Sequence, residues 1–155
     1  MLFLLFQLGK DRYALEAGRV LEVTPLLELK QVPAAPRGVA GIFNYRGRPV
    51  PAVDLSALTL GEPARERLST RIVVINYPDH AGKLQPLGLI AEQATEIIRR
   101  DGRDFVEPGL KLSGAPYLGP VLMDERGVIQ WVREQHLLPD RMRDLLFAET
   151  IEEAS

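Results

Sequence analysis

The sequence predicts a mainly β protein built from many short strands. Its 155 residues include 13 Gly and 12 Pro, which are spread along the chain and separate short segments rich in Val, Ile, Leu and Phe. Short segments of this kind, joined by turn residues and accompanied by few helical patterns, are typical of β-barrels or a β-sandwich. A faint internal repeat further predicts that the strands form two similar β subdomains.

Nine segments have the composition of strands, and turn residues such as those at 9–11 and 46–47 separate many of them. The apolar run at the start of the chain lacks a basic flank and a small-residue cleavage site, so we interpret it as a strand rather than a secretion signal. The predicted strands are residues 2–8, 12–16, 39–45, 48–54, 71–77, 85–90, 94–99, 118–124 and 127–133.

Helical signals are few. Residues 55–60 form a short candidate helix that closes at Gly61, and residues 16–20 could make a single turn. The stronger candidate runs from about 139 to 150, where apolar residues recur at helical spacing after Asp140 in the first turn.

The internal repeat relates two units that lie about 75 residues apart in the sequence. Residues 20–23 read Val-Leu-Glu-Val, and residues 94–97 read Ala-Thr-Glu-Ile; an apolar strand precedes each of them. The glycine-flanked hairpin at 41–54 has a similar counterpart at 119–133. Each unit is therefore expected to form a similar set of strands; the alternative is a chance similarity between short strings of Val, Leu and Glu.

Composition excludes several classes of protein. The chain has 19 basic and 21 acidic residues, a net charge of −2, so the overall basic character typical of nucleic-acid-binding domains is absent. It has no cysteine, which excludes a disulfide scaffold, a thiolate nucleophile and a cysteine-ligated metal.

Few residues could support catalysis. His80 lies in a predicted turn and His136 follows the last strand, and neither has an evident partner that would make it a general base. No serine lies in a Gly-x-Ser-x-Gly elbow, and the glycines and lysine of residues 109–114 are in the wrong order for a P-loop. We therefore expect no enzymatic activity, no cofactor and no metal site.

The most distinctive segment is residues 38–55, Gly-Val-Ala-Gly-Ile-Phe-Asn-Tyr-Arg-Gly-Arg-Pro-Val-Pro-Ala-Val-Asp-Leu. Residues 44–47 supply a hairpin turn between apolar strands. Pro49 and Pro51 cannot donate ladder hydrogen bonds, so the second strand is expected to lie partly at a sheet edge. A sheet edge beside apolar residues suits the docking of another protein.

This segment resembles the central motif of the CheW family of chemotaxis adaptors, G-x-N-L-R-G-x-x-(I/V)-P-(I/V)-x-D-L. Tyr45 stands where the family usually has Leu, and Ala91-Glu92 stands where it often has Val-Asp. The resemblance extends in family order over roughly residues 2–138. Its supporting matches are residues 3–9, 13–15, 20–23, 33–36, 72–75 and 88–91.

The resemblance implies one CheW-like domain that contains two five-stranded SH3-like β-barrel subdomains packed together. Subdomain 1 would comprise about residues 12–70. Subdomain 2 would comprise about residues 71–138 together with the N-terminal strand 2–8, and a C-terminal helix would follow at about 139–150.

The resemblance also implies a non-catalytic adaptor that couples chemoreceptors to a CheA-type histidine kinase. Its partners would be the regulatory domain of the kinase and the cytoplasmic tip of the receptor, with no nucleic-acid binding and no membrane insertion. It would be cytoplasmic and recruited to membrane-associated receptor arrays. The chain has room for no kinase, phosphotransfer or receiver domain, so a free-standing adaptor is expected. The alternative is a small-ligand sensor, or a generic protein-interaction module, that uses the groove between the barrels.

Two sets of apolar residues are candidates for partner binding. Val20, Ala94 and Ile97 are expected to line a shallow groove for the receptor tip, with a place in the protein core as the alternative. Leu29 and Val32, in a loop that precedes the proline-containing strand, are expected to dock the kinase.

The polar candidates surround the predicted hairpin turn. The resemblance aligns Arg46 and Glu22 with a family arginine and glutamate, and we expect an ion pair between them at the rim of the partner-binding surface. Asn44 and Gly47 would complete the turn. The alternative for Arg46 is an exposed side chain of little consequence.

Overall fold

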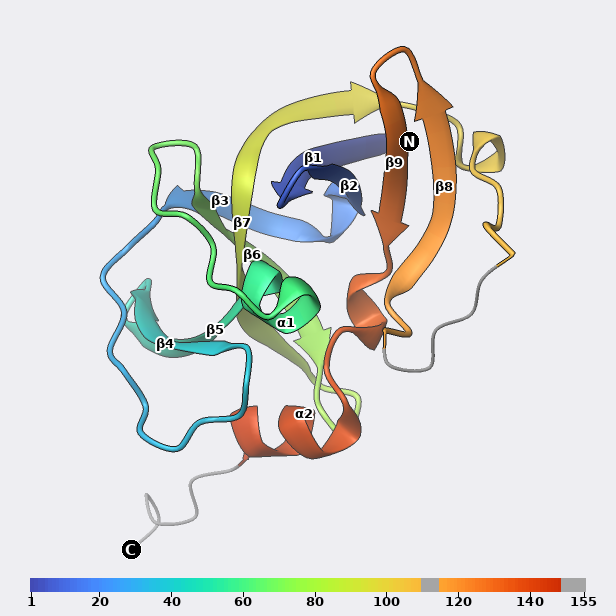
Figure 1. Ribbon diagram of the computed structural model, residues 1–155. Helices are drawn as coiled ribbons and strands as arrows, with labels where there is room; N and C mark the ends of the chain where they lie inside the picture. Colours follow the sequence, from blue (N-terminus) through green and yellow to red (C-terminus); the bar gives the residue numbers. More distant parts are fainter. Residues whose placement is uncertain (110–114, 149–155) are drawn as a thin grey trace, which may run out of the picture.

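The computed structural model describes residues 1–109 and 115–148 as a mainly β chain with two short α-helices (Figure 1). Its elements are β1 (Leu2–Leu8), β2 (Asp11–Glu16), η1 (Ala17–Arg19), β3 (Val20–Pro25), β4 (Val39–Tyr45), β5 (Arg48–Asp54), α1 (Leu55–Leu60), β6 (Arg71–Pro78), β7 (Leu84–Arg99), η2 (Gly102–Asp104), β8 (Leu118–Asp124), β9 (Gly127–Val132), η3 (Glu134–His136) and α2 (Asp140–Leu146).

Strand β7 belongs to two groups of strands. Its first half pairs antiparallel with β6 and parallel with β5, whereas its second half pairs antiparallel with β1. The first group therefore contains β3, β6, β7, β5 and β4, and the second contains β7, β1, β2, β9 and β8. Figure 1 shows β7 curving from one group into the other.

A bend at Gln93 lets β7 serve both groups. Gln93 has a φ of +53°, and the register between β1 and β7 shifts nearby, so that Leu5 pairs with Glu96 while Gln7 pairs with Glu92. Such a bulge bends a strand while keeping it in the sheet. The predicted strands 85–90 and 94–99 are consequently one strand in the structure.

The mainly β prediction is confirmed, but two separate closed barrels are not. The nine strands form one sheet that is not closed. Among the described residues, an isolated bridge spans the open side of each group: Lys30 pairs with Ile42, and Val106 pairs with Val121. In the first group, Lys30 follows the edge strand β3 and Ile42 lies in the other edge strand, β4. In the second group, Val106 follows β7 and Val121 lies in the edge strand β8.

Strand pairing does not follow the predicted boundary near residue 70. Strand β2 pairs with β1 and β9 in the second group because a tight turn at Gly9 and Lys10 returns the chain directly beside β1. Strand β6 pairs with β3 in the first group. The sequence prediction missed β3, in which Leu21 is exposed and Thr24 is buried, because its apolar residues do not alternate.

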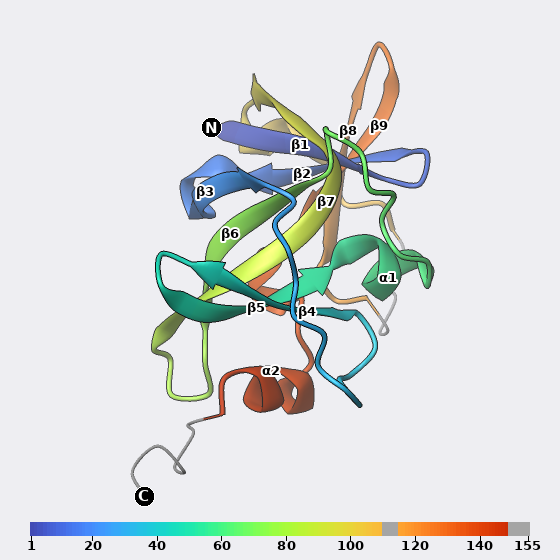
Figure 2. The same ribbon diagram turned by 90° about the vertical axis from the view of Figure 1, so that its left-hand side faces the viewer.

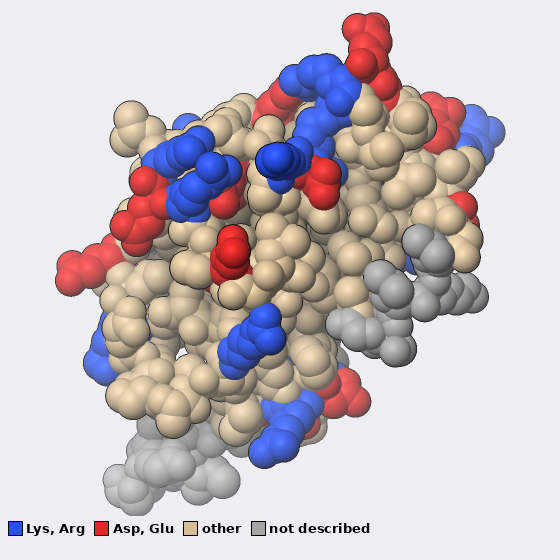
Figure 3. All heavy atoms as spheres, in the orientation of Figure 1, with Lys and Arg blue, Asp and Glu red and all other residues tan. Residues whose placement is uncertain are grey.

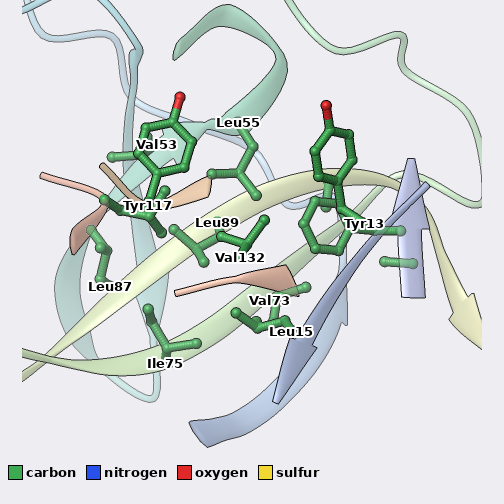
Figure 4. Packing of buried hydrophobic residues seen from close by; sticks show 14 of the residues in the cluster. Tyr13, Leu15, Val53, Leu55, Val73, Ile75, Leu87, Leu89, Tyr117 and Val132 are labelled. Carbon is green, nitrogen blue, oxygen red and sulfur yellow. The ribbon is translucent and has the colours of Figure 1, made fainter. Parts of the chain in front are cut away.

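Three hydrophobic clusters fill the molecule, one inside each group and one between them. In β6, Val73 and Ile75 face the central cluster, whereas Ile72 and Val74 face the cluster of the first group. Strand β1 likewise divides its side chains between the central cluster and that of the second group. Figure 4 shows the central cluster, to which β2, β5, β6, β7 and β9 all contribute. Burial on both faces explains the long apolar runs in these strands.

Asp54, the aspartate of the distinctive segment, has a structural role. One oxygen of its buried carboxylate accepts hydrogen bonds from the backbone N–H groups of Ser56 and Ala57, at 3.0 and 3.2 Å, and the other accepts from Ala64 at 2.9 Å. It therefore caps α1 and holds the loop beyond it. The helix ends, as predicted, at Gly61.

The C-terminal helix α2 is shorter than predicted. It ends at Leu146, whereas the sequence predicted helix to about residue 150; residues 149 and 150 lie outside the described residues.

In the described part of the chain, no helix has the length and apolar content needed to cross a membrane.

An ion pair between Arg12 and Asp124 joins β2 to the end of β8. Both nitrogens at the end of the guanidinium donate to the carboxylate, and Arg12 Nη1 lies 2.9 Å from Asp124 Oδ2. The hydrogen bonds from Arg12 lower the pKa of Asp124 from its ordinary 3.8 to about 2. Because the folded state favours the charged carboxylate, this interaction stabilises the fold above pH 4 and is lost as the pH falls toward 2.

We therefore predict that Asp124→Asn lowers the free energy of unfolding at pH 7 by about 1 kcal/mol, a value reduced for the partial exposure of the pair. Urea titrations between pH 7 and pH 2 check this. The difference between wild type and variant should shrink below pH 4; a difference that is the same at all pH values contradicts the assignment.

Candidate protein-interaction surfaces

The hairpin between β4 and β5 ends in a tight two-residue turn. Tyr45 pairs with Arg48, and the two residues between them, Arg46 and Gly47, have φ angles of +51° and +83°. Two positive φ angles in succession define the turn type that matches the twist of a hairpin. The side-chain oxygen of Asn44 accepts a 2.8 Å hydrogen bond from the Gly47 N–H and closes the turn.

The predicted ion pair between Arg46 and Glu22 is present. Arg46 Nη2 donates to Glu22 Oε1 at 2.8 Å, which connects the hairpin turn to β3. This hydrogen bond raises the pKa of Arg46. The guanidinium carbon also lies 5.4 Å from the centre of the Tyr45 ring. Because 74% of the Arg46 side chain is exposed, the pair contributes little to stability and remains accessible to a partner.

A shallow hollow of ≈ 750 Å³, the hairpin hollow, lies between the hairpin turn and the segment that follows β3. It brings together four predicted site residues, Leu29, Asn44, Arg46 and Gly47. The other described residues of its lining are Leu27, Glu28, Lys30 and Ile42.

A backbone contact fixes the shape of this hollow. Lys30 and Ile42 exchange N–H to carbonyl hydrogen bonds of 2.8 and 2.9 Å. Gly41 permits this approach, because a Cβ atom there would lie 2.5 Å from the Lys30 carbonyl oxygen. Gly41 therefore allows the segment that contains Leu29 to lie close against β4.

A larger groove of ≈ 1150 Å³, the proline groove, borders the same hairpin, and Ile42 lines both hollows. It contains Val32 and the two prolines of β5, Pro49 and Pro51. Leu29, which the sequence prediction grouped with Val32 for docking the kinase, lies in the hairpin hollow instead. Figure 2 shows α2 below β4 and β5, where its end forms one wall of the groove. The remaining described lining residues are Pro33, Ala34, Ala35, Pro36, Val39, Gly41, Ile42, Arg48, Gln85, Pro86, Leu145, Leu146, Phe147 and Ala148.

Tyr77 of β6 anchors this helical wall. Its hydroxyl accepts a 2.9 Å hydrogen bond from the Leu138 N–H and donates one of 3.2 Å to the Gln135 carbonyl. Its ring stacks on Phe147, with ring centres 6.0 Å apart. Sequence reasoning gave no role to Tyr77, and did not place the helix at the groove, because both contacts join segments that are distant in the sequence.

The three residues predicted to line a receptor groove do not share one surface. Ala94 is only 1% exposed and belongs to the central cluster, which corrects the prediction that it faces a partner. The bend at Gln93 turns it inward. Val20 is half-buried against the same cluster, whereas Ile97 is 59% exposed.

An exposed aliphatic patch on the second group was not predicted. Val106 lies opposite Val121, and Met123 lies opposite Val128 on the same outer face; Met123 is 67% exposed. We call these four residues the β8–β9 patch. In the sequence, the patch is marked only by apolar residues on both sides of Leu122, which is buried. The same pattern fits a strand that is buried on both faces, so it does not identify an exposed patch.

Charge is mixed on the face drawn in Figure 3, where acidic and basic side chains lie beside one another rather than in patches of one sign. Among residues 1–109 and 115–148, no group of three or more His, Cys, Asp and Glu side chains is placed to hold a metal ion.

Because Ala94 is buried and Ile97 is exposed, the same substitution is predicted to lower the free energy of unfolding strongly at Ala94 and hardly at all at Ile97. Ala94→Glu should lower the free energy of unfolding by more than about 3 kcal/mol, because it buries an unpaired charge. Ile97→Glu should change it by less than about 0.5 kcal/mol. Urea unfolding of the two variants checks this, and an unchanged Ala94→Glu protein would show that residue 94 is at the surface.

Comparison with known proteins gives three kinds of match. The model of the CheW-like domain family matches residues 2–142. Two relatives are each described as "Chemotaxis protein CheW". The one from Helicobacter pylori is 29% identical over 97 residues, which cover 63% of this chain and 56% of the relative. The one from Treponema pallidum is 27% identical over 113 residues, covering 70% of this chain and 64% of the relative. The chain thus spans less than two thirds of either relative.

A solved structure has the same fold. It is the scaffolding protein TtCheW from Thermoanaerobacter tengcongensis, which is 21% identical in sequence to this chain. The two structures superpose with a TM-score of 0.77, over 91% of this chain and 89% of the TtCheW chain. The family match, which includes the motif hairpin, both groups of strands and the start of α2, carries the assignment: this chain belongs to the CheW-like domain family.

Proposed function

We propose that this chain is a non-catalytic adaptor of a chemosensory array, which couples chemoreceptors to a CheA-type histidine kinase. Family membership and the two relatives described as chemotaxis proteins support the general role. The observation that carries the proposal is the rigid motif hairpin, which presents Arg46, paired with Glu22, beside two accessible concave surfaces. The adaptor would act in the cytoplasm at membrane-associated receptor arrays, without binding nucleic acid or entering the membrane.

The proline groove is the proposed docking site for the regulatory domain of the kinase. Its lining is mostly proline and aliphatic, and a rigid apolar surface of this kind can bury the apolar anchors of another protein. A small-ligand site would need several converging polar groups, whereas Arg48 is the one charged residue among the described residues of the lining. The groove thus favours a protein partner over the alternative of a small-ligand sensor.

The hairpin hollow and the adjoining β3 are the proposed contact for the receptor tip. Leu27 and Leu29 provide apolar surface there, and Glu28, Lys30 and Arg46 surround it with charges of both signs. An amphipathic helix can lay its apolar face on such a surface while its polar residues meet the rim. Neither Val20 nor Ile97 lines this hollow; exposed Ile97, in the half of β7 that pairs with β1, and half-buried Val20 are proposed as separate contacts of the receptor tip.

Arg46→Ala should leave the melting temperature nearly unchanged and reduce assembly of the complex of adaptor, receptor and kinase at least about fivefold, as expected for a residue at a binding hot spot. Co-sedimentation with receptor-containing membranes and the kinase measures the assembly. Arg99→Ala, which removes an exposed arginine from the other strand group, is the matched control.

The double variant Arg46→Glu with Glu22→Arg separates two roles of the pair. We expect assembly to remain impaired, because the partner would contact Arg46 directly. Full recovery would show that the pair only holds the turn, and an unaffected Arg46→Ala protein would remove Arg46 from the interaction surface.

Val32→Asp should weaken binding of the kinase regulatory domain by about 1–3 kcal/mol, the usual range for an apolar anchor, and leave receptor binding unchanged. Isothermal titration calorimetry measures the first and membrane co-sedimentation the second. Leu68→Asp is the control, since Leu68 is 100% exposed and lies outside the groove. Leu29 is not a suitable variant for this test, because it lines the hairpin hollow rather than the groove and packs against the cluster of the first group. An effect of Val32→Asp on receptor binding alone would mean that the two surfaces are assigned the wrong way round.

A further inference from the structure

The wall of the proline groove contains a strained backbone residue. Ala34 lines the groove and has a φ of +61°, in the left-handed region that residues other than Gly, Asn and Asp seldom adopt. Among the described residues other than glycine, only Arg46 and Gln93 also have a positive φ, and both are explained by their surroundings: the first lies in the hairpin turn and the second in the bend of β7. The methyl group of Ala34 makes no hydrogen bond that could offset the strain.

Pro33 and Ala34 are the central residues of a type II turn. The Ala35 N–H donates to the Val32 carbonyl at 3.3 Å, which closes a turn of four residues. The proline ring holds φ near −65°, so the turn types with a positive φ at the first central position are excluded. A negative φ at Pro33 followed by a positive φ at Ala34 leaves type II.

The sequence of this turn favours a different form. Type II turns usually have Gly or Asn at the second central position, whereas Pro-Ala suits type I, in which the second residue has a φ near −90°. The two forms differ mainly by rotation of the peptide group between Pro33 and Ala34, and the ends of the turn stay close together in both. A flip of this peptide therefore relieves the strain at Ala34 without separating Val32 from Ala35.

The central peptide of the turn is free to rotate. It lies outside the strands and helices, and in the part of the chain that the structure describes neither the Pro33 carbonyl nor the Ala34 N–H takes part in a backbone hydrogen bond. Both residues are exposed. The nearest backbone hydrogen bonds on either side of the turn are those of Lys30 and Pro36. A partner in the groove can therefore bind the peptide in either orientation.

We infer that the 32–35 turn is a two-state element, which is type II in the free protein and flips to type I when the kinase regulatory domain occupies the proline groove. The flip on docking rests on the proposed function, whereas the two states concern the free protein alone. Strain at Ala34 brings the two forms closer in free energy and so maintains a minor type I population. A partner that binds the type I form shifts the population toward it, and its apparent affinity depends on the fraction already flipped.

Ala34→Gly tests the two states in the free full chain, because glycine adopts a positive φ without strain. It should raise the melting temperature by about 2 °C and lower the type I population about fivefold, the factor that corresponds to the usual cost of a left-handed residue. NMR relaxation dispersion of the residue 35 amide measures this population through the exchange between the two forms. No exchange in the wild type, or exchange that Ala34→Gly leaves unchanged, would overturn the two-state turn.

Ala81→Gly is the matched control. Ala81 holds the same place in the exposed 79–82 turn, which the Gly82 N–H closes by donating to the Asp79 carbonyl at 2.9 Å, but its φ is not positive and it lies outside the groove. The control should lower the melting temperature slightly, because glycine there relieves no strain and adds freedom to the unfolded chain, and it should leave the exchange at residue 35 unchanged.

The flip on docking has its own measurement. The Pro33 Hα and the Ala34 amide proton lie side by side in type II and farther apart in type I, so their nuclear Overhauser effect should be strong in the free chain and weak in the complex with the kinase regulatory domain. Calorimetry should show binding about fivefold weaker for Ala34→Gly and unchanged for Ala81→Gly.

A strong effect that persists in the complex, or binding that Ala34→Gly leaves unchanged or tightens, would show that the partner binds the type II form and would overturn the flip. If neither the wild type nor Ala81→Gly binds the kinase domain, the proposed function fails, while the exchange measured in the free chain still decides whether the turn has two states.

Discussion

The shared strand β7 is the constraint on which the rest of the structure depends. Because it bends at Gln93, one half pairs with β6 and β5 and the other half with β1. The two groups must therefore lie against each other, and the central cluster fills the space between them. A substitution in this region, as at Ala94, is therefore expected to affect both groups. The outer sides of the groups carry the exposed surfaces, among them the hairpin hollow and the proline groove.

The residues of the distinctive segment divide into those that build the hairpin and those that it presents. Asp54 caps α1, Gly41 admits the Lys30 carbonyl, and Asn44 closes the turn at Gly47. These contacts leave Arg46 as the exposed cation of a rigid turn. Rigidity matters for an adaptor because a preformed surface loses less conformational freedom when it binds.

Sequence reasoning worked where the pattern was local. The hairpin turn, the sheet edge at Pro49 and Pro51, and helix α1 followed from turn residues, missing donors and a closing glycine. The pairing of Arg46 with Glu22 needed the resemblance to a family, since Arg46 lies in the turn of the β4–β5 hairpin and Glu22 lies in β3, which pairs with the distant β6. Contacts between distant segments were missed: the helix wall held by Tyr77 has no local signal. Ala94 was misplaced because alternation along a strand cannot reveal a bend.

Hydrogen exchange of backbone amides, with and without the kinase regulatory domain, tests the central claim most directly, namely that the partner binds on the outer side of the β4–β5 hairpin. The account predicts slower exchange on binding in the 30–36 loop, in the free edge of this hairpin and at the end of α2, with little change in β8 and β9. Slower exchange confined to the β8–β9 patch would contradict it.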